Sequence, residues 1–257
     1  MSRRSGPSDT TGASAVSTLT DHVALVTGAT SGIGRAIALE LAACRTRLCI
    51  VGRDRDRLKE VESQAAGRAA RVVVFQKDLT RDSEIEDVAC RLREEFGQLD
   101  VLVHSAGEIA SAQLESAAIE DFDRQYRANV RAPYLLTQRL LPLLKVMPGQ
   151  IVFVNSSAGL SARPGVGQFS ATQHAVRAMT DALRAEVNPY QIRVLSVFPG
   201  RTATPRQARL HERDGRAYQP ELLMQSEDVS SIIASALRLP RTAEVTDISM
   251  RPLLKSY

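Results

Sequence analysis

The sequence has no tryptophan, only three cysteines, and no apolar run that approaches the length of a membrane span. A membrane helix needs about 20 consecutive apolar residues, so we expect no membrane partner. The cysteines Cys44, Cys49 and Cys90 lack the paired spacing of a zinc site, and an odd number of them is typical of free thiols in a reducing compartment. We therefore predict a cytoplasmic protein without a metal site, in which Cys49 is a small buried apolar residue.

Lysine is scarce as well: the chain has 4 lysines against 29 arginines, with a net charge of +4 and a pI of about 9.2. The arginines are scattered along the chain and do not gather in one block. A scattered distribution of charge lacks the basic patch that binds a phosphate backbone. The sequence therefore predicts no nucleic-acid partner in spite of its high pI.

The sequence does contain a glycine-rich turn between an apolar run and a helical pattern. Val23–Val26 predicts a buried strand, Arg35–Ala43 predicts a helix, and Thr27-Gly28-Ala29-Thr30-Ser31-Gly32-Ile33-Gly34 lies between them. Only glycine lets the backbone turn this sharply and approach a pyrophosphate closely. The N-terminus of the helix that follows favours the same negative charge. This context predicts a dinucleotide-binding loop, and the alternative is a glycine turn without a ligand.

Strand-like and helix-like segments alternate along the rest of the chain. The expected strands are 48–51, 72–75, 101–104, 151–154, 192–197 and 244–248, and the expected helices are 54–66, 82–96, 120–144, 168–187 and 228–237. Apolar strands that alternate with helices predict an α/β fold, a doubly wound parallel sheet (Rossmann) in a single domain over residues 21–257. Residues 1–20 are rich in Ser, Thr and Gly without an apolar segment, and we expect a disordered tail rather than a secretory signal.

Four segments, taken in order, resemble the single-domain short-chain dehydrogenase/reductases. They are Thr27–Gly34, Asp78-Leu79-Thr80 after the third strand, His104-Ser105-Ala106-Gly107 after the fourth, and Pro199-Gly200 after the sixth. The resemblance covers residues 21–250 and implies an oxidoreductase that interconverts a ketone and a secondary alcohol with a nicotinamide cofactor. The chain departs from the family at His104-Ser105, where two asparagines are usual.

The residue at the end of the second strand predicts NADP as the cofactor. A carboxylate there would bind the ribose 2′-hydroxyl of NAD, whereas Arg53 could hold a 2′-phosphate with two hydrogen bonds. The alternative is a solvated Arg53 beside an Asp54 that caps the next helix. The resemblance implies that Asp78 accepts a hydrogen bond from the adenine amino group. The alternative is that Asp78 caps the N-terminus of the next helix. The candidate cofactor-binding residues are Gly28, Thr30, Ser31, Gly32, Ile33, Gly34, Arg53, Asp78, Leu79, Ser105, Ala106, Gly107, Pro199, Gly200 and Thr202, the last of these facing the nicotinamide carboxamide or a phosphate.

The catalytic group that the family uses is incomplete. The resemblance implies a tyrosine acid, a lysine that lowers its pKa, a serine and an asparagine, and Ser156 and Asn129 match the last two. The positions of the tyrosine and the lysine hold Phe169 and Gln173. A phenyl ring has no proton to donate, and a neutral amide cannot lower a neighbour's pKa. Loss of a general acid slows a reaction by roughly 10² to 10⁴.

Two replacements for the missing acid stay open. A register shifted by one residue, from Ser157, would pair Ser170 with His174, but it breaks the surrounding matches, and we favour a place for His174 on the helix surface or in an interface. Tyr126 lies three residues before Asn129 and could supply a phenol, although we favour packing in the buried face of its helix.

Residues 201–225 match the family's substrate lid. This segment carries Tyr218 and five arginines, namely Arg201, Arg206, Arg209, Arg213 and Arg216. A basic lid suits an acidic substrate or one tethered to a carrier protein, and the alternative is a solvated mobile loop.

We therefore expect a non-catalytic or weakly catalytic subunit of a heteromeric NADP-dependent dehydrogenase/reductase. Its helices at 120–144 and 168–187 would pair with an intact sister subunit or with a second copy of itself. The resemblance extends to partner subunits of antibiotic pathways, such as aminocoumarin ones, in which a carrier-bound β-hydroxytyrosyl group is oxidised. The alternatives are an active atypical NADPH-dependent ketoreductase and a binding protein that senses NADPH.

Overall fold

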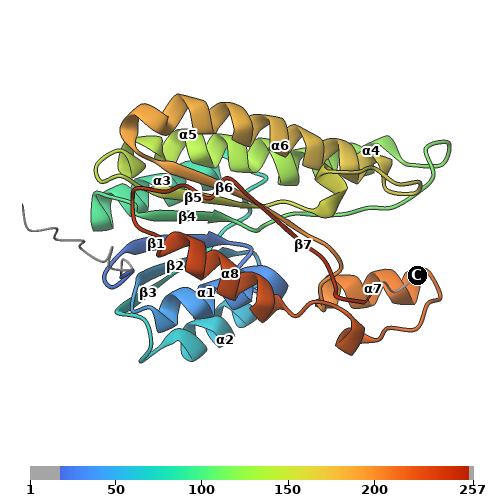
Figure 1. Cartoon of the computed structure of the whole chain (residues 1–257), viewed down its shortest axis with the longest axis horizontal. Helices are drawn as coiled ribbons and strands as arrows, with labels where there is room; N and C mark the ends of the chain where they lie inside the picture. Colours follow the sequence, from blue (N-terminus) through green and yellow to red (C-terminus); the bar gives the residue numbers. More distant parts are fainter. Residues whose placement is uncertain (1–17, 255–257) are drawn as a thin grey trace, which may run out of the picture.

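The computed structural model describes residues 18–254, and its centre is a parallel sheet of seven strands in the order β3-β2-β1-β4-β5-β6-β7 (Figure 1). The strands are β1 (Val23–Thr27), β2 (Arg47–Gly52), β3 (Arg71–Gln76), β4 (Val101–His104), β5 (Gln150–Val154), β6 (Arg193–Pro199) and β7 (Asp247–Met250). The single doubly wound domain predicted from the sequence is confirmed. The tail expected at residues 1–20 lies outside the described residues up to position 17, and Leu19 is buried in the core.

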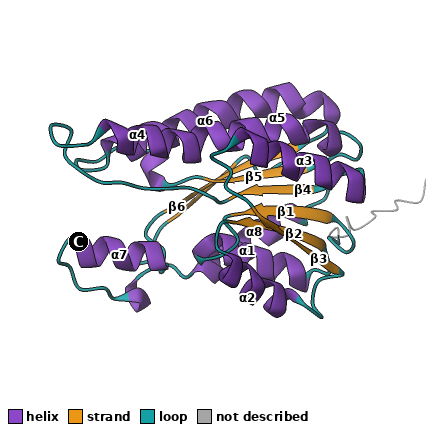
Figure 2. Cartoon of the chain, turned by 180° about the vertical axis from the view of Figure 1, so that it is seen from behind, coloured by secondary structure: helices purple, strands orange, loops and turns teal. Residues whose placement is uncertain are grey.

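Two layers of helices cover the two faces of the sheet (Figures 1 and 2). On one face lie α3 (Asp82–Phe96), α5 (Ala132–Leu144) and α6 (Gly167–Val187), and on the other lie α1 (Gly32–Ala43), α2 (Arg55–Ala65) and α8 (Ser226–Leu237). Every residue of β1 and β4 is buried, which explains why both strands are continuous apolar runs in the sequence. No helix in residues 18–254 is long and apolar enough to cross a membrane.

The sheet order places a crevice beside β1. Chain connections run outward from β1 through β2 to β3 on one side, and through β4 to β7 on the other. In doubly wound sheets, ligands bind where this direction changes, at the carboxyl ends of the strands. The fold therefore positions the glycine turn after β1 at the expected binding point.

The helix expected over residues 120–144 is interrupted. It consists of α4 (Ile119–Tyr126), a π-helical turn (Arg127–Arg131) and α5. Pro133 has no amide hydrogen to donate to the carbonyl of Asn129, four residues earlier. The regular series of α-helical hydrogen bonds is therefore broken at this point. The helix therefore widens just before Pro133 into a turn that contains Asn129.

The last strand begins later than expected. β7 starts at Asp247 rather than at residue 244, and it pairs with β6 from Ser196 onward. The side chain of Glu244 accepts a hydrogen bond from the Val194 amide at 2.8 Å, where a paired strand would offer a backbone carbonyl. The carboxylate of Glu244 therefore takes the place of the first backbone hydrogen bond between the two strands.

Two buried side chains show how closely the sheet is packed. Cys49 in β2 is buried as predicted, and burial raises the pKa of its thiol to about 12, which leaves it unreactive. His104, the last residue of β4, stacks on Phe153 of β5 with the ring centroids 4.6 Å apart. Its Nε2 lies 2.8 Å from the hydroxyl of Thr137 in α5. Burial lowers the pKa of His104 to about 3, so the folded chain keeps this imidazole neutral.

His104 predicts a pH dependence of stability. Between about pH 6.5 and pH 3, His104 is protonated in the unfolded chain but stays neutral in the folded chain. Protonation of His104 therefore favours the unfolded chain, and the fold loses stability as the pH falls. Replacement His104→Gln removes this titration. We expect the free energy of unfolding of the wild type, measured by urea denaturation, to fall relative to the variant by up to about 1.4 kcal/mol per pH unit between pH 6 and pH 4.

The exposed His174 provides the matched control, because His174→Gln removes an imidazole from the surface of α6 rather than from the core. We expect this control to follow the wild type. Identical pH profiles for the wild type and His104→Gln would contradict the account.

Candidate functional site

A cleft with a volume of about 790 Å³ opens at the carboxyl ends of the strands. The residues that line it come from the turn after β1, from the ends of β2 to β6, and from α6 and α7 (Pro205–Arg213). All fifteen candidate cofactor-binding residues line this cleft, and so do Asn129, Ser156, Phe169 and Gln173. The structure thus brings these nineteen residues together in one cleft.

The glycine turn leaves room for a ligand and none for side chains. Gly28 and Gly32 have φ values of +66° and +52°, in the left-handed region that favours glycine. A Cβ atom on Gly34 would lie 2.3 Å from the carbonyl oxygen of Gly28, and one on Gly28 would lie 2.8 Å from the Cα of Ala106. The side chain of Ser31 does not cap α1, so the first amide groups of this helix have no side-chain acceptor there. This cradle fits a dinucleotide pyrophosphate.

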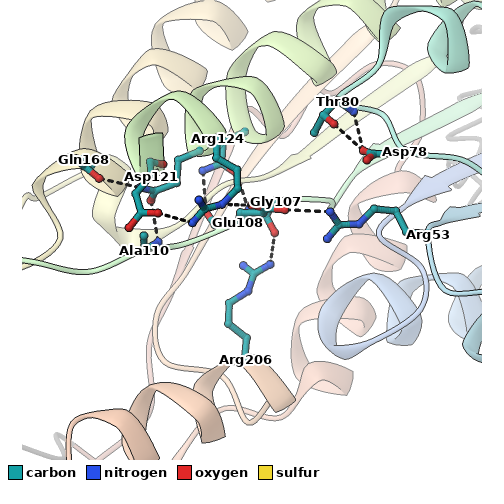
Figure 3. A network of polar contacts seen from close by, with 12 residues as sticks. Arg53, Asp78, Thr80, Gly107, Glu108, Ala110, Asp121, Arg124, Gln168 and Arg206 are labelled. Atoms are coloured by element: carbon teal, nitrogen blue, oxygen red, sulfur yellow. Dashed lines mark hydrogen bonds and ion pairs between the residues drawn. The ribbon is translucent and has the colours of Figure 1, made fainter. Parts of the chain in front are cut away.

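At the end of β2, the alternative interpretation of the sequence, a capping Asp54 beside a solvated Arg53, holds only for Asp54. Asp54 caps α2, since its Oδ1 accepts hydrogen bonds from the amides of Asp56 and Arg57, each at 3.1 Å. Arg53 is not simply solvated, because its Nη1 lies 3.2 Å from Oε1 of Glu108. The cation is therefore directed across the cleft instead of away from it (Figure 3).

Asp78 forms a turn with its neighbour and does not cap the next helix. Its Oδ1 accepts hydrogen bonds from the amide and the hydroxyl of Thr80, at 3.0 and 2.8 Å, whereas the N-cap position before α3 is held by Arg81. Burial raises the pKa of Asp78, but the two bonds from Thr80 together with the charges of Arg53 and Arg81 hold that pKa below its ordinary value. Asp78 is thus a fixed, ionised acceptor, and the helix-cap alternative is wrong.

The expected reaction centre lies between the end of β5 and α6. Ser156 follows β5, and its Oγ accepts from the Ala158 amide at 3.1 Å. Phe169 and Gln173 are one turn apart on α6 and face the cleft, with exposed fractions of only 9% and 6%. The Asn155 amide nitrogen donates to the backbone carbonyl of Gln173 at 3.0 Å and so fixes α6 against the sheet. The phenyl ring and the neutral amide therefore occupy the positions predicted for them.

Asn129 uses its side chain to connect two segments. Its Oδ1 accepts from the amide of Glu108 at 2.7 Å, and its Nδ2 donates to the carbonyl of Glu108 at 2.9 Å and to the hydroxyl of Thr172 at 3.0 Å. The loop after β4 is thereby tied to α6. Asn129 serves the site by positioning this loop.

Neither replacement for the missing acid is present at the cleft. Ser170 is 2% exposed and does not line the cleft, and His174 lies on the surface of α6 with its Nδ1 2.9 Å from the Ser170 carbonyl. The shifted serine–histidine register is therefore wrong, and the surface position of His174 is confirmed. Tyr126 is 49% exposed and also lies outside the cleft, so our preference for buried packing was wrong. The buried side chain at this turn is Gln125.

The segment 201–225, for which a substrate lid is expected, contains a helix that the sequence interpretation missed. Thr204 caps α7 by accepting from the Gln207 amide at 3.2 Å, and Pro205 follows in the first turn. A capping threonine before proline was the signal that could have predicted it. Arg206 from α7 donates to the carbonyl of Gly107, so the lid is attached to the loop after β4 (Figure 3).

Glu108 is the site residue that sequence reasoning did not single out. It pairs with Arg53 through Oε1 and with Arg124 of α4 through Oε2, each at 3.2 Å (Figure 3). An acidic residue directly after Ala106-Gly107 was the only signal. In residues 18–254, no group of three or more His, Cys, Asp or Glu side chains gathers in a way that could hold a metal ion.

Comparison with known proteins relates this site to others. A family model described as short chain dehydrogenase matches residues 22–215. An uncharacterized short-chain type dehydrogenase/reductase of Sinorhizobium fredii is 36% identical over 236 residues, which cover 90% of this chain and 91% of the relative. An uncharacterized oxidoreductase of Staphylococcus aureus is 29% identical over 236 residues, which cover 91% of this chain and 99% of the relative.

Solved structures agree in fold. An alcohol dehydrogenase from the archaeon Thermococcus sibiricus, complexed with 5-hydroxy-NADP, has a TM-score of 0.83 and 25% identity, covering 92% of this chain and 98% of its own. The closed form of a serine dehydrogenase complexed with NADP+ has a TM-score of 0.82 and 26% identity, covering 91% and 96%. Because the family model spans most of the chain and a relative above 30% identity spans nearly all of it, this chain belongs to the short-chain dehydrogenase family.

Proposed function

We propose that this chain binds NADP(H) in its cleft and lacks the proton donor of an active family member. It then acts as a non-catalytic or weakly catalytic subunit of a short-chain dehydrogenase/reductase that interconverts a ketone and a secondary alcohol. The observation that carries this proposal is the position of Phe169 and Gln173, which line the cleft together with Ser156. Bound NADP(H) would supply the hydride chemistry, and what the chain's own residues lack is the matching proton.

Three features support NADP(H) as the ligand. The glycine turn has room for a pyrophosphate and none for a Cβ atom at Gly34. The end of β2 presents the cation of Arg53 where a family member specific for NAD would present a carboxylate. The alcohol dehydrogenase and the serine dehydrogenase with the same fold carry 5-hydroxy-NADP and NADP+.

The titratable groups at the cleft do not replace the missing acid. No tyrosine of the described residues lines the cleft, and His104 stays neutral at pH 7 because burial lowers its pKa to about 3. Lys77 and Asp78 follow β3, four strands away from the β5 strand that carries Ser156, or about 19 Å at the usual strand spacing. Glu108 is engaged in ion pairs with two arginines. The cleft can therefore orient a carbonyl near Ser156 without protonating it efficiently.

The outer face of α6 supports the proposal of a partner subunit. Ala171, Ala175 and Ala178 are exposed along one side of this helix, and Tyr134 of α5 is 57% exposed. Small residues at this spacing let a second helix approach closely. A second chain of the same fold, either an intact relative or another copy, would pack here. The antibiotic pathway and the carrier-tethered substrate stay predictions on which no described contact bears.

The partner surface predicts a change of association state. We expect the purified wild type to self-associate in sedimentation velocity and Ala178→Arg to sediment as a monomer, because the long side chain holds the helices apart. Glu62→Arg, at an exposed position of α2 on the opposite face of the sheet, is the control for added charge. A wild type that stays monomeric, alone and when mixed with an intact relative, would rule this surface out.

The cofactor proposal predicts that Arg53 discriminates NADPH from NADH. Arg53→Gln should weaken NADPH binding about tenfold, since a hydrogen bond to a charged group contributes about 1.5 kcal/mol, and should leave NADH binding unchanged. Nucleotide fluorescence on titration with protein measures both affinities. Arg55→Gln, an exposed arginine outside the cleft, should behave as the wild type. An equal loss for both nucleotides would contradict the assignment.

Restoring the missing pair should create activity. In Phe169→Tyr/Gln173→Lys, a phenol and an ammonium would face the cleft beside Ser156, and a general acid typically accelerates a reaction by roughly 10² to 10⁴. We expect NADPH oxidation with a panel of ketones to rise by about 10² or more over the wild type. The added substitution Ser156→Ala should abolish most of this gain.

Two results would contradict the proposal of a lost acid. One is a wild type that already reduces ketones as fast as the double variant. The other is a folded double variant that binds NADPH and gains nothing.

A further inference from the structure

We propose that Glu108 competes with the 2′-phosphate of NADP(H) for Arg53, and that it thereby limits how strongly the chain prefers NADP(H) over NAD(H). This inference rests on the NADP(H) site proposed above. It assigns to Glu108 a role in nucleotide selectivity, as a residue that acts against binding. The contacts that carry it are those around the Gly107–Glu108 segment (Figure 3).

The ion pair between Arg53 and Glu108 crosses the cleft. Arg53 follows β2, Glu108 follows the end of β4, and β1 lies between these two strands in the sheet. The turn at the end of β1 is the glycine cradle for the pyrophosphate. The pair at 3.2 Å therefore connects the two sides of the cleft over the point where a dinucleotide would lie (Figure 3).

Glu108 is the fixed member of this pair. Its carboxylate is held from the other side by Nε of Arg124 at 3.2 Å, and its backbone amide and carbonyl both bind the side chain of Asn129. The carbonyl of the preceding Gly107 accepts from Arg206 of α7. Its side chain is 23% exposed, against 64% for the side chain of Arg53. Arg53 is thus the side chain that can move to another anion.

A 2′-phosphate is a stronger acceptor for Arg53 than Glu108 is. The contact with Glu108 uses one guanidinium nitrogen at 3.2 Å, whereas phosphate can take two parallel hydrogen bonds and carries more charge. Exposed ion pairs of this kind contribute little stability, so the exchange is feasible. It is not free, however, because the pair with Glu108 breaks and two anions then lie near each other.

Both of these costs fall on nucleotides with a 2′-phosphate. NAD(H) has a hydroxyl at this position and gains nothing from Arg53, so the pair with Glu108 can persist. Removing the charge of Glu108 should therefore improve NADP(H) binding selectively. The effect should shrink when Arg53 is absent, because only the repulsion between Glu108 and the 2′-phosphate then remains.

The test measures dissociation constants of NADPH and NADH, by fluorescence titration at low salt, for the wild type and for Glu108→Gln. We expect the variant to bind NADPH about three- to tenfold more tightly and NADH within about twofold of the wild type. Glu94→Gln makes the same charge change on an exposed position of α3 outside the cleft and should match the wild type. In an Arg53→Gln background, Glu108→Gln should improve NADPH binding by less than about twofold, because no ion pair with Arg53 is left to break.

The outcomes separate this inference from the proposed function. If the wild type binds NADPH but Glu108→Gln binds it equally or more weakly, Glu108 does not compete and the inference is overturned alone. The same follows if the gain is equally large in the Arg53→Gln background, because repulsion between Glu108 and the phosphate would then explain it without any competition for Arg53. If the wild type binds neither nucleotide, the proposed function is wrong, and the inference that rests on it is wrong as well.

Discussion

The packing of the β1 turn against the loop after β4 is the contact on which the rest of the site depends. The hydroxyl of Thr27 accepts from the amides of Ser105 and Ala106, at 3.0 and 3.2 Å, and donates to the Val103 carbonyl at 3.2 Å. Since a Cβ atom at Gly28 would already lie 2.8 Å from this loop, the two backbones touch without side chains between them. This contact sets the width of the cleft and lets residues after β2 and β4 face each other across it.

Under the proposed function, the chain keeps what positions a nucleotide and lacks what moves a proton. The bond from Asn155 goes to the backbone carbonyl of Gln173, so α6 stays in place whatever side chain stands at that position. Phe169 has nearly the shape of a tyrosine, and a neutral glutamine amide costs less to bury than an ammonium group. The fold therefore has no need of a tyrosine and a lysine at these sites, which explains how the scaffold persists without them.

Most of the helices and strands could be predicted because local patterns of apolar residues determine them. The boundaries of α3 and β4 agree with the expected ones, since a regular apolar period and continuous apolar runs determine them. What the sequence did not reveal depends on contacts between distant segments. The pairing of Glu108 with Arg53 joins residues 55 positions apart, and the exposure of Tyr126 follows from the wide turn before α5. The cap of α7 at Thr204 was a local signal that went unused.

A crystal structure of the unmodified chain grown with NADP+ tests the central claim most directly. The account predicts the pyrophosphate against the glycine turn and the 2′-phosphate within hydrogen-bonding distance of Arg53, with the contact between Arg53 and Glu108 broken. It also predicts the nicotinamide beside Phe169 and Gln173. A nucleotide bound elsewhere, or a 2′-phosphate that makes no contact with Arg53, would contradict it.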